Sequence, residues 1–172
     1  MEERTYEQVA LIGAGVIGSG WATRCLAKGL SVVLTDPSPD ARSQVKKTIE
    51  GAWPVLEDSG LASQGDSTNF RFVETIQEAV EGADFIQENV PEREDLKIEV
   101  HKTIDRYAAE DVVIASSSSG LLPSRLQDQC QYPDRILIGH PFAPVYLLPL
   151  VEIVAGEKTS TEVVRRAGAF YR

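Results

Sequence analysis

Two histidines are the side chains best suited to move a proton near neutral pH, and one of them stands where a ligand could reach it. His140 ends an apolar strand pattern and directly precedes a rigid, proline-rich segment. Imidazole titrates near neutrality, which suits a base that removes a proton from a hydroxyl group. His101 lies in the middle of a helical pattern among charged residues, so we expect it on a solvated face.

Glu152 is the residue that could assist His140. It lies twelve residues further on, in an apolar strand pattern where a charged residue is out of place. A carboxylate among apolar neighbours is partly desolvated unless it pairs. Pairing with His140 would orient the imidazole and stabilise the cation that forms when it accepts a proton. A Glu that points outward from an edge strand is the other interpretation, and the sequence leaves both open.

A glycine-rich stretch near the N-terminus indicates a second kind of chemistry. Gly13, Gly15 and Gly18 follow an apolar strand pattern and open a helical one, as in sites that bind dinucleotides. The first glycine permits a tight turn, the second lets a pyrophosphate approach the backbone, and the third allows close packing of helix on strand. Free N–H groups and the dipole at the start of that helix favour phosphate there.

Asp36 indicates which dinucleotide would bind. It ends the next strand pattern, 18 residues after Gly18, near the spacing of an acid that binds the adenine ribose 2′-hydroxyl. A carboxylate in that place repels a 2′-phosphate, so NAD is favoured over NADP. A structural turn beside a surface Asp is the alternative interpretation.

Alternating strands and helices would bring these residues together. Apolar strand patterns lie at residues 9–12, 30–35, 70–73, 83–87, 112–115, 135–139 and 150–154, and helical patterns separate most of them. This alternation predicts an α/β fold, namely a Rossmann-type, doubly wound and mostly parallel sheet with helices on both faces. Pro54 is expected to kink or interrupt the helical pattern that contains it.

Several polar segments follow predicted strand ends and should line one crevice beyond the carboxyl ends of the strands. These segments are Gly13–Gly18, Asp36, Asn89–Glu92, Ser116–Ser119 and His140. One hydroxyl of the serine run could donate to a substrate oxygen, whereas most of the run is typical of a small polar turn. Phe142 and Tyr146 are either ordinary core residues or an aromatic wall against a cationic group.

Composition and charge limit the classes of partner. A chain of 172 residues suits one domain, and its net charge of −9 argues against nucleic acid or an anionic membrane surface. No apolar run approaches membrane-spanning length, and residues 1–4 lack the form of a secretory signal. Cys25, on an apolar helix face, and the distant Cys130 form no CxxC pair. We therefore expect no metal site, no disulfide framework and a cytoplasmic location.

The chain resembles the N-terminal lobe of the 3-hydroxyacyl-CoA dehydrogenase superfamily at Gly13–Gly18, Asp36, Ser116–Ser119, Gly139–Phe142 and Leu150–Glu152. Within that superfamily it most closely resembles the L-carnitine 3-dehydrogenases, at Gly15–Ala22, Ile86–Glu92, His140–Phe142 and Val145–Glu152. The L-gulonate 3-dehydrogenases, relatives of lambda-crystallin, share much of the pattern. The resemblance implies NAD-dependent oxidation of a 3-hydroxy acid, with L-carnitine as the leading substrate. L-3-hydroxyacyl-CoA, L-gulonate and a non-catalytic, crystallin-like NAD-binding role are the alternatives.

The resemblance also implies roles for individual residues. His140 would be the general base, Glu152 its partner, and Ser119 would hydrogen-bond the substrate hydroxyl. Glu92 and Lys97 match positions near the nicotinamide end of the cofactor. The expected cofactor contacts are Gly13, Gly15, Val16, Ile17, Gly18, Asp36, Asn89, Glu92, Lys97 and Ser117.

The chain departs from the family pattern in three ways. Ala143 stands where the pattern has Asn beside the reaction centre, and Ser118 stands where Thr is usual. Residues 1–172 correspond to the NAD-binding domain alone. The family's all-helical second domain, which closes the substrate cleft, supplies another catalytic Asn and builds a homodimer, is expected to be absent. We therefore expect NAD binding with weak or no turnover from this chain by itself.

Overall fold

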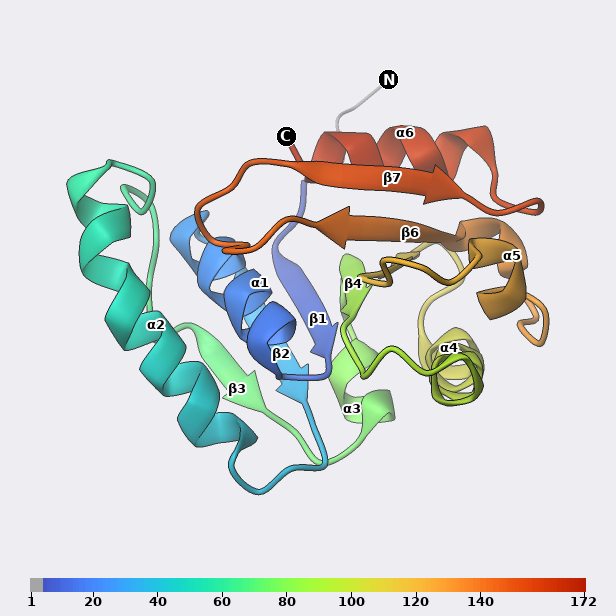
Figure 1. The fold of residues 1–172 in the computed structure, drawn as a ribbon, viewed down its shortest axis with the longest axis horizontal. Coiled ribbons are helices and arrows are strands. Elements are labelled where there is room, and N and C mark those ends of the chain that lie inside the picture. The colour runs from blue at the N-terminus through green and yellow to red at the C-terminus, as the bar shows by residue number, and fades with distance from the viewer. Residues whose placement is uncertain (1–4) are drawn as a thin grey trace.

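A computed structural model describes residues 5–172 of the chain (Figure 1). Residues 1–4, where the sequence argues against a secretory signal, lie outside the described residues. Within the described range, no helix combines the length and the apolar character needed to cross a membrane.

The strands of the described chain form one sheet in the order β3-β2-β1-β4-β5-β6-β7 (Figure 1). Neighbouring strands are parallel except for the last pair, β6 and β7, which is antiparallel. The predicted mostly parallel sheet is therefore confirmed. The strands are β1 (Gln8–Ile12), β2 (Ser31–Thr35), β3 (Phe70–Phe72), β4 (Phe85–Glu88), β5 (Val113–Ser116), β6 (Ile136–Pro141) and β7 (Val151–Ala155).

Helices cover both faces of the sheet because alternate side chains of each strand point to opposite faces. In β1, Val9 and Leu11 join a buried cluster that includes residues of α1, α2 and α6. Ala10 and Ile12 join a second cluster with residues of α3 and α4. The helices are α1 (Val16–Ala27), α2 (Ala41–Asp58), α3 (Ile76–Val80), α4 (Glu94–Tyr107), α5 (Pro123–Leu126) and α6 (Thr161–Phe170).

The strand order reverses direction at β1, which sets the position of the site. The chain proceeds from β1 to β2 and β3 on one side, and then returns to β4 on the other. In open α/β sheets, ligands bind in the crevice outside the carboxyl ends of the strands at such a reversal. The loops after β1 and β4 meet there, and the backbone N–H of Asn89 donates to the carbonyl of Ile12 at 2.6 Å.

Of the two expected effects of Pro54, interruption does not occur, because α2 continues from Ala41 to Asp58 with the proline inside it. Proline removes the hydrogen bond that would reach the carbonyl four residues earlier. That residue is Glu50, which is exposed, so water can satisfy its carbonyl. Buried residues on both sides of the proline, Ile49 and Leu56 among them, keep the helix on the core.

Candidate cofactor and catalytic site

A cleft of about 820 Å³ lies at the carboxyl ends of β1, β2 and β4, where the sheet order reverses. The polar segments expected to share one crevice do meet there. Of the predicted site residues, the lining includes Gly13, Gly15, Val16, Ile17, Asp36, Asn89, Glu92, Lys97, Ser117, Ser119 and His140. Gly18 and Glu152 are outside the lining and support it from behind, as described below.

The three glycines differ in what surrounds them. Gly13 has φ +95°, and a Cβ there would lie 2.8 Å from the backbone of Asn89. A Cβ on Gly18 would collide with the carbonyl oxygen of Gly13, so Gly18 allows α1 to pack against the loop. No atom lies within 4 Å of the place a Cβ would take on Gly15. The backbone at Gly15 is therefore open to a ligand.

The start of α1 offers the electrostatics that an anion needs. The helix begins at Val16, which is 79% exposed, and its first turn contains no acidic residue. The first N–H groups of a helix have no partner within the helix and carry partial positive charge. A phosphate bound beside Gly15 would meet these groups.

Asp36 stands at the end of β2 and is tied to the glycine loop. Its Oδ2 accepts a hydrogen bond from the backbone N–H of Ala14 at 2.7 Å, and its Oδ1 accepts one from Ser38 at 2.8 Å. Each carboxylate oxygen retains a further lone pair for a ligand hydroxyl. The carboxylate lies in the lining of the cleft, as a ribose-binding acid requires.

His140 and Glu152 form the expected pair. They are directly opposite each other on the antiparallel strands β6 and β7, and Nδ1 lies 3.0 Å from Oε2. Because a carboxylate only accepts, Nδ1 carries the proton, and the free Nε2 is left as the basic atom. The Glu152 side chain is 59% exposed because β7 is the edge strand, so the pairing and the edge-strand interpretation both hold.

Glu92 organises the serine loop after β5. Its Oε1 accepts hydrogen bonds from the Ser118 hydroxyl at 2.6 Å and from the backbone N–H groups of Ser119 and Gly120 at 3.1 Å. Burial acts to raise the pKa of Glu92, but these bonds and the nearby Lys97 charge outweigh burial, so the pKa lies below its ordinary value. The loop is thereby held around an anion. Ser119 lines the cleft, and within residues 5–172 its hydroxyl makes no hydrogen bond.

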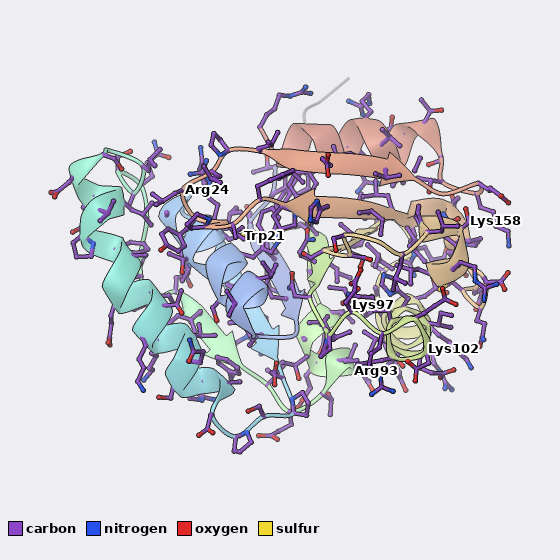
Figure 2. All side chains as sticks on the ribbon, viewed as in Figure 1. Trp21, Arg24, Arg93, Lys97, Lys102 and Lys158 are labelled. Atoms are coloured by element: carbon purple, nitrogen blue, oxygen red, sulfur yellow. The ribbon has the colours of Figure 1, made fainter. Side chains whose placement is uncertain are left out.

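Lys97 lies at the floor of the cleft and is 1% exposed (Figure 2). Its Nζ donates to Glu88 Oε1 at 2.7 Å and to the Val90 carbonyl at 2.9 Å, and it lies 3.6 Å from Glu92 Oε2. Glu88 is completely buried and also accepts from the Ser116 hydroxyl at 2.5 Å. Lys97 therefore neutralises a buried carboxylate, a role that sequence reasoning missed.

The expected solvated position of His101 is wrong, because its side chain is completely buried beneath Lys97. Nδ1 lies 2.8 Å from the carbonyl of Lys97, one turn earlier in α4. Burial lowers the pKa of His101 although Glu88 acts to raise it, so the ring is neutral in the folded protein near neutral pH. Among the described residues, Nε2 has no hydrogen-bond partner.

The remaining candidates divide between core and surface. Tyr146 packs on a small apolar cluster with Leu56, which supports the core interpretation for it. Phe142 is 36% exposed, and its ring lies 5.3 Å from that of His140. Ala143 is exposed on the loop after β6 and is outside the cleft lining.

The cysteines and the acidic residues add no further site in the described part of the chain. Cys25 and Cys130 are both free, and burial raises the pKa of the Cys25 thiol to about 12. A thiol that stays protonated is a poor nucleophile and a poor metal ligand. Within residues 5–172, the His, Cys, Asp and Glu side chains form no group of three that could hold a metal ion.

Comparison with protein families gives one match that spans nearly the whole chain. Residues 8–172 match the model described as "3-hydroxyacyl-CoA dehydrogenase, NAD binding domain". Among curated relatives, the L-carnitine dehydrogenase of Burkholderia mallei is 52% identical over 163 residues, which are 95% of this chain and 51% of that protein. The L-carnitine dehydrogenase of Bacillus cereus is 46% identical and aligns with 100% of this chain and 53% of its own length. The chain thus spans about half the length of these relatives.

Solved structures give the same fold. A 5-formyl-3-hydroxy-2-methylpyridine 4-carboxylic acid 5-dehydrogenase, described as an NAD⁺-dependent dismutase, is 36% identical with a TM-score of 0.89 over 98% of this chain and 55% of its own. The 3-hydroxybutyryl-CoA dehydrogenase of Escherichia coli K12 has a TM-score of 0.88 over 98% of this chain and 36% of its own. At 22% identity, the second likeness concerns the fold alone.

Proposed function

Since this chain belongs to the 3-hydroxyacyl-CoA dehydrogenase NAD-binding domain family, we propose that its cleft binds NAD and serves the oxidation of a small 3-hydroxy acid. One observation carries this proposal. The Glu152-paired imidazole of His140 lines the same cleft as the open backbone at Gly15 and the start of α1. A dinucleotide site and a base thus share one space.

The residues present fit NAD in particular. Gly15 leaves room for a pyrophosphate beside the N–H groups of α1, and Gly13 and Gly18 keep that loop in place. Asp36 presents a carboxylate that can accept from a ribose 2′-hydroxyl and would repel a 2′-phosphate. Val16, Ile17, Asn89, Glu92, Lys97 and Ser117 complete the proposed cofactor contacts.

The chain's own groups account for the proton in the proposed reaction. Bound NAD supplies the hydride acceptor. His140 Nε2 takes the proton of the substrate hydroxyl, and Glu152 stabilises the imidazolium through Nδ1–H. The free hydroxyl of Ser119 binds the substrate oxygen, while Glu92 holds the Ser119 backbone in place.

L-carnitine is the substrate that we favour, with 3-dehydrocarnitine as the product. Relatives with about 50% sequence identity to this chain bear the name L-carnitine dehydrogenase, among them the Burkholderia mallei protein at 52%. The exposed ring of Phe142 beside His140 offers an aromatic face to a quaternary ammonium group. L-3-hydroxyacyl-CoA and L-gulonate are the alternative substrates.

We place this chain as the NAD-binding domain of a cytoplasmic enzyme. The half of the curated relatives that it does not span would close the substrate side of the cleft and build a homodimer. Apolar side chains in the segment between β6 and β7 agree with a covering segment, since Leu148 is 45% and Leu150 54% exposed. Two free cysteines suit a reducing compartment. The net charge of −9 does not suit nucleic acid or anionic membranes.

The test is NADH formation with L-carnitine, an L-3-hydroxyacyl-CoA and L-gulonate as separate substrates. We expect turnover with L-carnitine when this chain is fused to the second half of the Burkholderia mallei relative. With the chain alone, the rate should fall well below the ordinary enzymatic range of about 1–1000 s⁻¹. Exclusive turnover of either other substrate would reassign the specificity. NAD binding without turnover in the fusion would favour a non-catalytic role, unless Ala143→Asn restored activity.

A further inference from the structure

A buried glutamine joins the cleft to the last helix of the chain. Gln87 lies in β4 and is 1% exposed. Its Nε2 donates to the Ser117 hydroxyl oxygen at 2.8 Å and to the Gly139 carbonyl at 3.0 Å. Its Oε1 accepts from the Tyr171 hydroxyl at 2.6 Å. One amide therefore connects β4, the loop after β5, the strand that carries His140, and the end of α6.

The direction of each hydrogen bond in this cluster follows from its neighbours. The Gly139 carbonyl can only accept, so the amide nitrogen of Gln87 must face it and the amide oxygen must face Tyr171. The Tyr171 hydroxyl must then donate. Burial raises the pKa of Tyr171 well above its ordinary value, so the proton it donates is retained.

The same reasoning extends to the glycine loop. The Trp21 indole can only donate, and its Nε1 lies 3.2 Å from the Ser117 hydroxyl oxygen. Ser117 thus accepts from Trp21 and Gln87, and its own proton goes to Asn89 Oδ1 at 2.7 Å. The amide nitrogen of Asn89 then faces the carbonyls of Gln87 at 3.0 Å and Gly13 at 3.5 Å.

Ser117 consequently has no free hydrogen-bonding capacity for a ligand in this structure, whereas Asn89 Oδ1 retains one lone pair. The Ser117 oxygen accepts two bonds and donates one, which is all that a hydroxyl can do. Both residues line the cleft. They form part of its wall, and Asn89 also binds the glycine loop through the Gly13 carbonyl. Their orientation depends on which way the Gln87 amide points.

Gly139 allows Tyr171 to reach Gln87. A Cβ on Gly139 would collide with the Tyr171 hydroxyl, so only glycine leaves room for that ring. Gly139 directly precedes His140 in β6. The end of α6 therefore packs on the backbone of the strand that carries the proposed base.

We propose that Gln87 and Tyr171 are positioning residues, which couple the end of α6 to the orientation of His140 and to the Ser117–Asn89 wall of the cofactor cleft. This inference rests on the proposed function, because it concerns the NAD cleft and its base. Neither residue is part of the cleft lining, and Gln87 acts on it through its hydrogen bond to Ser117. Loss of the Tyr171 hydroxyl leaves the buried Gln87 Oε1 without its donor, so the amide that binds Ser117 and Gly139 is held by fewer partners.

Tyr171→Phe tests the proposal in the 172-residue chain, with Tyr6→Phe as the matched control. The Tyr6 hydroxyl donates to the Arg166 carbonyl at 3.2 Å, so the control also removes a hydroxyl that binds α6 but leaves Gln87 untouched. We expect the NADH dissociation constant of Tyr171→Phe to rise about threefold to tenfold, the range of one lost hydrogen bond. Tyr6→Phe should leave it within about twofold.

A second measurement does not depend on NADH. Because the chain has two histidines, ¹⁵N spectra of the imidazoles resolve the His140 tautomer directly. We expect the Nδ1–H form to dominate in the parent and in Tyr6→Phe, and to lose that dominance in Tyr171→Phe. Gln87→Glu, which keeps its size and still accepts from Tyr171 but lacks the two N–H groups that bind Ser117 and Gly139, should have the same effects on both measurements.

The outcomes separate this inference from the proposed function. If the parent does not bind NADH, the proposed function fails, and the His140 spectra alone decide the role of Gln87 and Tyr171. The inference is overturned if Tyr171→Phe and Gln87→Glu have the same His140 spectrum as the parent and, where the parent binds NADH, the same dissociation constant. Equal changes in Tyr171→Phe and Tyr6→Phe would also overturn it, because they would indicate general loosening of α6.

Discussion

Replacing Lys97 with methionine lowers the free energy of unfolding by about 3–5 kcal/mol, the cost of leaving one partner of a buried ion pair alone. Glu88 would keep its carboxylate in a fully buried site, and the Val90 carbonyl would lose its donor. Methionine fills most of the space of the lysine stem, so lost packing contributes little. Urea denaturation followed by circular dichroism measures the change.

Lys102→Met is the matched control on the same helix. Lys102 points to solvent, with 51% of its side chain exposed, a loose ion pair at 3.7 Å to Glu99 and an exposed hydrogen bond at 3.4 Å to Gln129 Oε1 (Figure 2). We expect its replacement to change stability by less than about 0.5 kcal/mol. The double variant Glu88→Gln/Lys97→Met should recover part of the loss, because no charge is then left unpaired. A loss below about 1 kcal/mol for Lys97→Met would mean that Glu88 is not charged in the folded protein.

Replacing His140 with asparagine should lower the rate of L-carnitine oxidation about 10²- to 10⁴-fold in the fused enzyme, the usual contribution of a positioned base. Asparagine keeps a polar group opposite Glu152 but cannot take the hydroxyl proton. The NAD dissociation constant should stay within about twofold, since His140 lies at the substrate end of the proposed site. Stopped-flow NADH formation and calorimetry measure the two quantities.

Glu152→Gln should lower the same rate by less than His140→Asn does. It removes the charge that stabilises the imidazolium, but Glu152 is 59% exposed and water can replace part of its effect. We therefore expect a smaller loss, on the order of tenfold. A His140→Asn enzyme that retains more than a tenth of the parent rate would show that another group removes the proton.

The fold and the cleft could be predicted because both depend on regular patterns. Gly13 and Asn89 follow different strands, yet parallel strands end at one edge of the sheet, so residues after them must meet. The spacing of the glycines predicted a dinucleotide site, and the carboxylate of Asp36 predicted NAD as the cofactor. The bounds of β4 and β5 differ from the expected ones by one or two residues, which changes no assignment.

The edge of the sheet was harder to predict. A short apolar pattern around Glu152 is compatible with a central strand or with an edge strand. Pairing with His140 was expected, but the sequence left the exposure of Glu152 open, since exposure depends on β7 having no neighbour on its far side among the described strands. The continuity of α2 through Pro54 depends on tertiary packing in the same way, because the buried residues Ile49 and Leu56 keep both halves of the helix on the core.

The buried polar residues were missed because charge was taken as a sign of exposure. Lys97 and His101 are four residues apart and therefore share one face of α4, which was the available signal. That face also carries Ile104, a buried residue, so the stripe points inward. Gln87 and Glu88, at the end of an apolar strand, needed buried partners, and the sequence did not identify which residues those were.

Calorimetric titration of this chain with NAD and, separately, with NADP tests the central claim most directly. The cleft at Gly15 and the carboxylate of Asp36 predict clear binding of NAD and at least about a hundredfold weaker binding of NADP, since apposed like charges cost several kcal/mol. NADP binding as tight as NAD binding would contradict the role of Asp36. Failure to bind NAD would contradict the assignment of the cleft as a dinucleotide site.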